Sequence, residues 1–136
     1  MSEKIFQSKV ISWLEKQNTY AVKFNASGIS KNGVPDVLVC LNGYFLGLEL
    51  KTDKGVASAL QKYNINQINM MGGVSIVLRP SMWEDFKKYT LEFLEGVLPF
   101  EAYKTTLLYL HLKGKELNNE NNKTKGKSTI IWGWRV

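Results

Sequence analysis

The sequence is poor in the side chains that form cross-links or bind soft metals. Its 136 residues include one cysteine, Cys40, and one histidine, His111. A single cysteine excludes an internal disulfide and a thiolate zinc site, and a single histidine excludes a His-rich metal site. Any metal would therefore be held by oxygen ligands, which favours Mg²⁺, Mn²⁺ or Ca²⁺.

Long apolar runs are missing as well. No segment approaches the ~20 apolar residues of a membrane-spanning helix. The opening MSEKIFQSKV lacks the apolar core of a signal peptide. We therefore expect an intracellular, cytoplasmic protein that has no membrane partner.

The charge balance is basic. Eighteen Lys and Arg residues against twelve Asp and Glu residues give a formal net charge of +6. This excess suits a polyanionic partner, nucleic acid first and an anionic membrane surface second. A charged surface that only keeps the protein soluble is the alternative. The apolar content of 44% is sufficient for a core in a chain of this length.

The order of hydrophobic patterns predicts an α/β domain with a mixed β-sheet. Two β-forming runs flank Asn42-Gly43, a strong hairpin signal, and both faces of this hairpin are apolar, as in strands covered on both sides. Cys40 lies in mid-strand and is expected in the core. The expected elements are a helix over 2–17, a strand over 20–25, a hairpin over 34–51, a helix over 57–71 with Leu60, Ile65, Ile68 and Met71 on its apolar side, a strand over 74–78 and a helix over 81–95 capped by Ser81.

The pattern is weaker after Pro99. Residues 105–112 fit either a strand or a helix, residues 113–127 are expected to form a Lys-rich loop, and residues 128–136 alternate as in a terminal strand. We expect residues 1–98 to form the core and residues 99–136 an extension that belongs to the same domain or to a dimer interface. Trp132 and Trp134 fit a core or interface role better than stacking on bases.

Two acidic residues meet at the open end of the hairpin. A two-residue turn at Asn42-Gly43 pairs Val37 with Leu48 and would place Asp36 opposite Glu49. Lys51 returns to the same face of the sheet. Two facing carboxylates repel each other unless a cation neutralises them, so a divalent metal site is one interpretation. A surface salt bridge between Lys51 and one of the acids is the other.

Val34-Pro35-Asp36, then twelve residues, then Glu49-Leu50-Lys51 resembles the PD-(D/E)xK nuclease signature. With Gly33, Asn42-Gly43, Thr52, Gln61 and Gly72-Gly73, the stretch is similar to the VRR-NUC branch, including its small phage members. Val77-Leu78-Arg79 stands where that branch has its Val-Arg motif, although Pro80 replaces the second Arg. The resemblance covers about residues 2–95 and implies a restriction-endonuclease-like mixed β-sheet flanked by helices.

The resemblance also implies roles for individual residues. Asp36, Glu49 and the backbone carbonyl of Leu50 would bind Mg²⁺, or Mn²⁺ in its place. Lys51 would position the attacking water and offset charge in the transition state. Gln61, on the following helix, would contact the active-site lysine or the DNA backbone, and a solvated helix residue is its alternative. Gln67, six residues further along the same helix, is a second and less favoured candidate for this role.

Glu3 matches the acidic residue that such nucleases carry on the first helix, near a second metal. Its spacing from Phe6, Val10 and Leu14 places it on the buried face of the first helix, where an acid needs a partner. An ordinary first-turn acid, favoured by the helix dipole, is the alternative.

Several basic residues are candidate DNA contacts, each of which a solvated surface would also explain. They are Lys23, Lys31, Lys54, Arg79, Lys123, Lys125 and Lys127.

These features together predict a Mg²⁺-dependent endodeoxyribonuclease of a bacterium or a phage-infected host. A domain this small has few base-reading elements, so it is expected to select branched, flap or Holliday-junction DNA by shape. A homodimer would suit matched cleavage of two strands. The alternative is a non-catalytic module that retains the nuclease-like fold and binds DNA or a protein.

Overall fold

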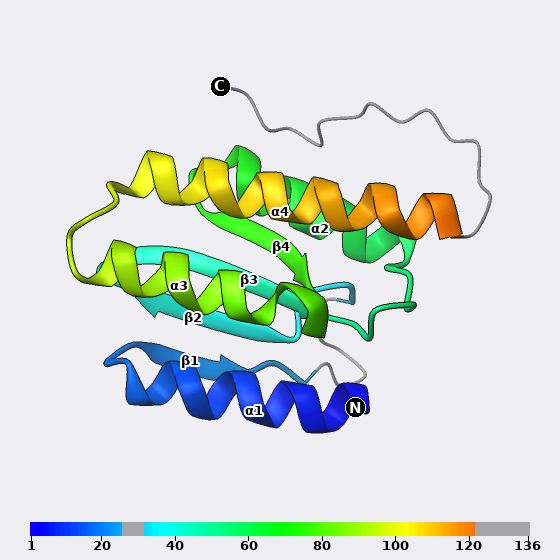
Figure 1. Ribbon diagram of the computed structural model, residues 1–136, viewed down its shortest axis with the longest axis horizontal. Coiled ribbons are helices and arrows are strands. Elements are labelled where there is room, and N and C mark those ends of the chain that lie inside the picture. The colour runs from blue at the N-terminus through cyan, green and yellow to red at the C-terminus, as the bar shows by residue number, and fades with distance from the viewer. Residues whose placement is uncertain (26–31, 122–136) are drawn as a thin grey trace.

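A four-stranded sheet in the order β1-β2-β3-β4 organises the fold, with helices on both of its faces (Figure 1). The computed structural model describes residues 1–25 and 32–121, with side chains as far as residue 114. The α/β class and the mixed sheet flanked by helices are confirmed. The elements are α1 (Glu3–Lys16), β1 (Tyr20–Lys23), β2 (Val37–Leu41), β3 (Tyr44–Leu50), α2 (Ala59–Met70), β4 (Val74–Leu78), η1 (Pro80–Met82), α3 (Trp83–Leu94) and α4 (Phe100–Asn121).

The predicted hairpin register is observed. β2 and β3 are antiparallel, with pairs running from Leu41–Tyr44 to Val37–Leu48. Asn42 and Gly43 both adopt positive φ, 50° and 84°, as the two-residue hairpin turn requires. β1 adds to β2 antiparallel, and β4 adds to β3 in parallel through the crossover helix α2.

The main core lies between one face of the sheet and the helices α1, α3 and α4. Every second residue of β2, β3 and β4 faces this core, and α1 contributes Phe6, Val10 and Leu14. Ser2 caps α1, since its Oγ accepts a hydrogen bond from the Ile5 N–H at 3.1 Å. The predicted first helix, including its buried side, is confirmed.

The opposite face is covered over β3 and β4 but open over β1 and β2. There α2 packs Ile65 against Val77 in a second, smaller core cluster. Cys40 on β2 is exposed, which corrects its predicted place in the core. On β1 the small Ala21 faces the main core and the larger Tyr20 is exposed. Tyr20 and Cys40 pair with each other and lie on the face of the sheet that α2 covers only over β3 and β4.

Helix α2 turns polar residues toward the protein. Its buried residues are Asn64, Ile65 and Asn69, whereas Leu60 and Met71 are exposed, contrary to the predicted apolar side. For Asn69 the reason is the outer edge of β4, whose backbone needs hydrogen-bond partners, whereas the amide of Asn64 donates to the carbonyls of Leu60 and Asn32. The Asn69 side chain accepts from the Ser75 N–H at 2.8 Å and donates to the Ser75 carbonyl at 2.9 Å.

The same edge receives a second side chain from α4. Nδ1 of the buried His111 accepts a hydrogen bond from the Val77 N–H at 2.9 Å. Asn69 and His111 thus satisfy successive outward-facing groups of the edge strand, which an exposed strand would leave open to pairing with other chains.

The start of α3 differs from the prediction. Pro80 opens a short 3₁₀ turn, and α3 begins at Trp83, so Ser81 is not its N-cap. The backbone N–H of Ser81 instead donates to Oδ1 of Asp53 at 3.0 Å.

The chain after Pro99 forms the long helix α4. It buries Tyr103, Leu107 and Leu110 in the main core, at a spacing that a helix satisfies and a strand does not. The predicted loop over 113–127 is therefore wrong for residues 113–121, and the predicted strand over 128–136 lies outside the described residues. None of the described helices is both long and apolar enough to cross a membrane.

Candidate active site

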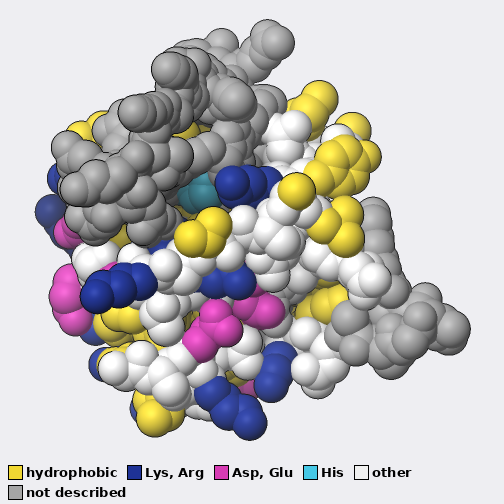
Figure 2. Space-filling view, turned by 90° about the vertical axis from the view of Figure 1, so that its right-hand side faces the viewer, with side chains coloured by type: hydrophobic (Ala, Val, Ile, Leu, Met, Phe, Trp, Pro, Cys, Tyr) yellow, Lys and Arg dark blue, Asp and Glu magenta, His cyan; other side chains and the backbone are white. Residues whose placement is uncertain are grey.

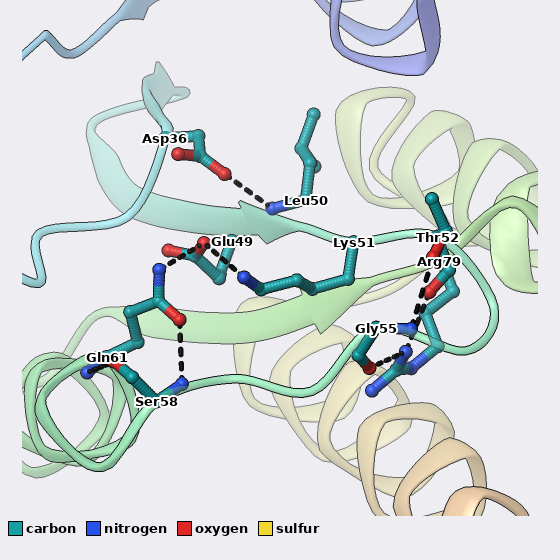
Figure 3. A network of polar contacts seen from close by, with 9 residues as sticks. All are labelled: Asp36, Glu49, Leu50, Lys51, Thr52, Gly55, Ser58, Gln61 and Arg79. Carbon is teal, nitrogen blue, oxygen red and sulfur yellow. Dashed lines mark hydrogen bonds and ion pairs between the residues drawn. The ribbon is translucent and has the colours of Figure 1, made fainter. Parts of the chain in front are cut away.

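Asp36, Glu49 and Lys51 lie together at the carboxyl end of β3 (Figure 3). Glu49 is near the end of the strand, Leu50 ends it, and Lys51 follows. Asp36 lies just before β2, beyond the last ladder pair at Val37–Leu48. The predicted cross-strand pair of Asp36 and Glu49 is thus absent from the ladder, but the two carboxyl groups still lie on the same site.

Asp36 is tied to both neighbouring strands. Its Oδ2 accepts a hydrogen bond from the Leu50 N–H at 2.9 Å. Its backbone carbonyl accepts from the Phe24 N–H at 2.7 Å, just after β1. The first bond fixes the carboxylate beside the end of β3 through Oδ2, so Oδ1 is not used by Leu50.

Glu49 is the most buried of the site's charged residues, with 2% of its surface exposed. Its Oε2 accepts from Nε2 of Gln61 at 2.9 Å and lies 3.9 Å from Nζ of Lys51. Its Oε1 is buried and has no hydrogen-bond partner among the described residues. A buried oxygen of this kind is costly unless a proton or a cation satisfies it.

Burial raises the pKa of Glu49 to about 8. The negative charge of Asp36 adds to the shift, and so does a hydrogen bond between the two carboxyl groups, which the protonated acid can donate. The ammonium of Lys51 opposes the rise, and Glu3 contributes a smaller increase. Without additional positive charge, Glu49 therefore holds its proton at neutral pH. Because Glu49 is buried, its contact with Lys51 is not the surface salt bridge that was the alternative interpretation of the sequence, since such bridges lie in water.

Gln61 is oriented by the first turn of α2. Its backbone N–H donates to Oγ of Ser58 at 3.1 Å, and its Oε1 accepts from the Ser58 N–H at 2.8 Å, which together form a capping box. Because Oε1 is used in this way, the amide presents Nε2 to Glu49. Ser58 did not figure among the candidate site residues, although the Ser-x-x-Gln pattern before a helix is a readable signal.

The site offers oxygen donors suited to a hard divalent cation. Asp36 and Glu49 supply two carboxylates, and the orphan Oε1 of Glu49 is the oxygen that such a cation would satisfy. Leu50 is in place through its N–H, while its predicted carbonyl ligand stays a prediction. Within residues 1–25 and 32–121, no group of three or more His, Cys, Asp or Glu side chains is arranged to hold a metal.

Glu3 differs from its predicted environment. It lies in the first turn of α1, on the side of Phe6 and Val10, but its side chain is exposed. The core ends before the first turn, so this acid does not need a buried partner. Its negative charge makes only the smallest contribution to the raised pKa of Glu49.

The basic candidates divide into three groups. Lys23 and Lys54 are exposed, and Arg79 is buried at 7% exposure. Lys31, Lys123, Lys125 and Lys127 lie outside the described residues. Figure 2 looks onto the end of the molecule where β3 and β4 finish, with acidic side chains near its centre and Lys and Arg side chains around them.

No protein-family model matches this chain, and no curated protein matches it significantly. Among solved structures, the chain is similar to Hjc, a Holliday junction resolvase from the archaeal hyperthermophile Archaeoglobus fulgidus, with 22% sequence identity and a TM-score of 0.43. The similarity covers 55% of this chain and 66% of the resolvase chain, just under two thirds of its length. A similarity of this extent does not indicate the function of this chain, which has to be inferred from the side chains of the site.

Proposed function

We propose that this protein is a Mg²⁺-dependent endodeoxyribonuclease that hydrolyses DNA phosphodiester bonds and belongs to the VRR-NUC branch of the PD-(D/E)xK nucleases. The observation that carries the proposal is the buried carboxyl of Glu49, with one oxygen unpartnered among the described residues, between Asp36 and Lys51. A purely structural strand end has no need of a second acid beside a buried first one, because the pair is repulsive.

Asp36 and Glu49 are the residues that would hold the cation, with Mn²⁺ able to substitute. A divalent cation in such a site supplies Lewis acidity and charge neutralisation for phosphodiester hydrolysis. The chain itself holds the two carboxylates in place: the Leu50 N–H orients Asp36, and the amide of Gln61 orients Glu49. Preorganised ligands of this kind reduce the rearrangement needed on binding.

Lys51 has a different task in this proposal. Its ammonium lies 3.9 Å from Oε2 of Glu49. From there it can donate hydrogen bonds to the water that attacks phosphorus and to a non-bridging phosphate oxygen, where negative charge increases in the transition state. Lys54 and Lys23, both exposed, would contact the DNA backbone beyond the scissile phosphate.

The substrate class follows from what surrounds the site. The described chain forms a single sheet with its covering helices, and a small domain of this kind has few elements for reading base edges. We therefore propose that the enzyme selects branched DNA, a flap or a Holliday junction by shape, acting in the cytoplasm. A homodimer would place two sites on the two strands that such a reaction cuts.

Cleavage of labelled duplex, single-stranded, flap and four-way-junction DNA tests the proposal, each with Mg²⁺, Mn²⁺ or EDTA. Wild type is compared with Glu49→Gln, which retains the shape of the side chain and removes its charge. Metal-dependent cleavage that Glu49→Gln abolishes is expected. Tight DNA binding without cleavage of any substrate would exclude the nuclease and support the binding module.

A further inference from the structure

The loop between β3 and α2 joins the two halves of the site. Residues 52–57 connect Lys51 to Ser58, the N-cap whose capping box orients Gln61. Any movement of this loop would therefore shift both side chains that contact Glu49. What holds the loop in place is consequently important for the site.

Arg79, directly after β4, holds this loop through two hydrogen bonds. Its Nη1 donates to the carbonyl of Thr52 at 2.8 Å and to the carbonyl of Gly55 at 2.7 Å (Figure 3). The loop also closes on itself, since the Gly55 N–H donates to both Oγ1 and the carbonyl of Thr52. A second tie comes from Asp53, whose Oδ1 accepts from the Ser81 N–H.

One of the two residues held by Arg79, Gly55, lies beside the side chain of Lys51. A Cβ atom placed on Gly55 would lie 3.4 Å from both Cβ and Cδ of Lys51, so the backbone of Gly55 packs on the aliphatic stem of the lysine. Fixing the Gly55 carbonyl therefore fixes the surface on which this stem rests. The stem in turn directs the ammonium toward Glu49, 3.9 Å away.

Arg79 has little surface with which to contact DNA. It is 7% exposed, and α4 crosses close above it, where a Cβ on Gly114 would lie 4.0 Å from both Cδ and Nε of Arg79. Burial also lowers the pKa of its guanidinium, and the charge of Asp53 opposes that change. A phosphate contact would need the opposite environment, an exposed cation facing solvent.

We infer that Arg79 is a positioning residue, which clamps the 52–57 loop against Lys51 and so aligns Lys51 and Gln61 on Glu49, and that it is not a contact to DNA phosphate. The inference rests on the proposed nuclease for its effect on activity. Its structural part, the clamp itself, is independent of that function.

Arg79→Met tests the inference against Lys54→Met, a matched control that removes the same charge from an exposed residue of the same loop. DNA binding is measured by fluorescence anisotropy in EDTA over a range of salt concentrations. Loss of one phosphate contact reduces the slope of log K against log salt by about 0.9. Lys54→Met is expected to show this reduction and Arg79→Met to retain the wild-type slope.

Hydrogen exchange reads out the clamp directly. In Arg79→Met, exchange over residues 52–58 is expected to be about tenfold faster, with β2 and β3 unchanged. Cleavage should lose about tenfold or more in kcat with KM within about twofold, as for a misaligned site. A reduced salt slope in Arg79→Met, or unchanged exchange in the loop, would overturn the inference.

Arg79→Lys covers the case in which Arg79→Met fails to fold. Lysine retains the charge but lacks the planar fork of donors. Faster exchange of the loop with an unchanged salt slope is expected, and wild-type exchange would show that the clamp does not need the guanidinium. If no variant, including wild type, cleaves any DNA, the nuclease proposal fails, while exchange and salt dependence still decide the role of Arg79.

Discussion

The side-chain amide of Gln61 donates to Oε2 of Glu49 at 2.9 Å while its own carbonyl oxygen is occupied by the Ser58 N–H. One side chain thus completes the N-terminus of α2 and contacts a buried acid of the sheet. The two tasks use different atoms of the amide, so a substitution can separate them.

Gln61→Glu is the substitution that does so. Glutamate serves in a capping box as well as glutamine does, so the start of α2 should be preserved. At Glu49, however, a donor is replaced by a third carboxyl group beside those of Asp36 and Glu49, which raises the pKa of Glu49 further and disfavours its ionised form. We expect a melting temperature close to that of wild type and a loss of at least about tenfold in cleavage at pH 7, partly recovered at higher pH.

Gln67→Glu is the control, because Gln67 lies on the same helix and has no hydrogen bond to Glu49. It introduces the same charge and should retain cleavage. Equal activity of Gln61→Glu and wild type would mean that the bond between Gln61 and Glu49 has no functional part.

The raised pKa of Glu49 predicts how stability depends on pH in the metal-free protein. Between the ordinary value of 4.5 and about 8, the folded state holds a proton that the unfolded state has released. Stability is therefore highest below this window and falls as pH rises through it, by on the order of a few kcal/mol, with no further loss above pH 8 from this group. Urea unfolding at pH 5, 7 and 9 measures the change.

Glu49→Gln isolates this contribution, because it removes the titrating group and leaves the other acids in place. The variant should lose less stability than wild type between pH 5 and pH 9 and should exceed it at pH 9. Parallel curves for the two proteins would show that Glu49 titrates normally.

Metal binding should be linked to the same proton. A cation binds the ionised carboxylate, so binding at pH 7 must displace the proton of Glu49. We expect the affinity for Mg²⁺ to rise by close to tenfold per pH unit below pH 8 and to level off above it. Calorimetry in two buffers of different ionisation enthalpy should find about one proton released at pH 7, and a pH-independent affinity would contradict the assignment of Glu49 as a ligand.

Asp36→Asn tests the second carboxylate without removing its structural bond. The asparagine oxygen can still accept from the Leu50 N–H, so the fold should be retained. Losing the negative charge lowers the pKa of Glu49 toward its ordinary value, because the charge of Asp36 contributes to the shift. Mg²⁺ binding and cleavage should fall by at least tenfold even so, since one ligand charge is gone.

Asp36→Ala provides the comparison. It removes the partner of the Leu50 N–H as well, and it should cost a further ~1–3 kcal/mol in unfolding free energy that Asp36→Asn does not. Nearly equal stabilities of the two variants would mean that the bond to Leu50 contributes little.

Local patterns were sufficient for the centre of the fold. Asn42-Gly43 fits a turn with two positive φ angles and few alternatives, and this turn sets the register that brings Asp36 to the end of β3. The period of two along β3 then places Glu49 and Lys51 on one site. These relationships involve neighbours in sequence or across a single hairpin, where chain geometry alone is decisive.

The other outcomes depended on how distant segments pack. Cys40 is exposed because α2 does not cover its part of the sheet. Residues 113–121 are helical because they continue α4, whose apolar side is buried in the main core. A short apolar run carries no information about which surface will receive it.

Arg79 shows the division most clearly. By itself the sequence determined the hairpin, its register and the pair of acids with a lysine, because each is set by the local conformational preferences of a few adjacent residues. Only the tertiary structure decided that Arg79 is buried and hydrogen-bonded to the loop after Lys51, and that Glu49 is buried away from solvent. Burial is a property of every segment that packs around a residue, and two identical charges in sequence become a surface contact or an internal clamp according to what covers them.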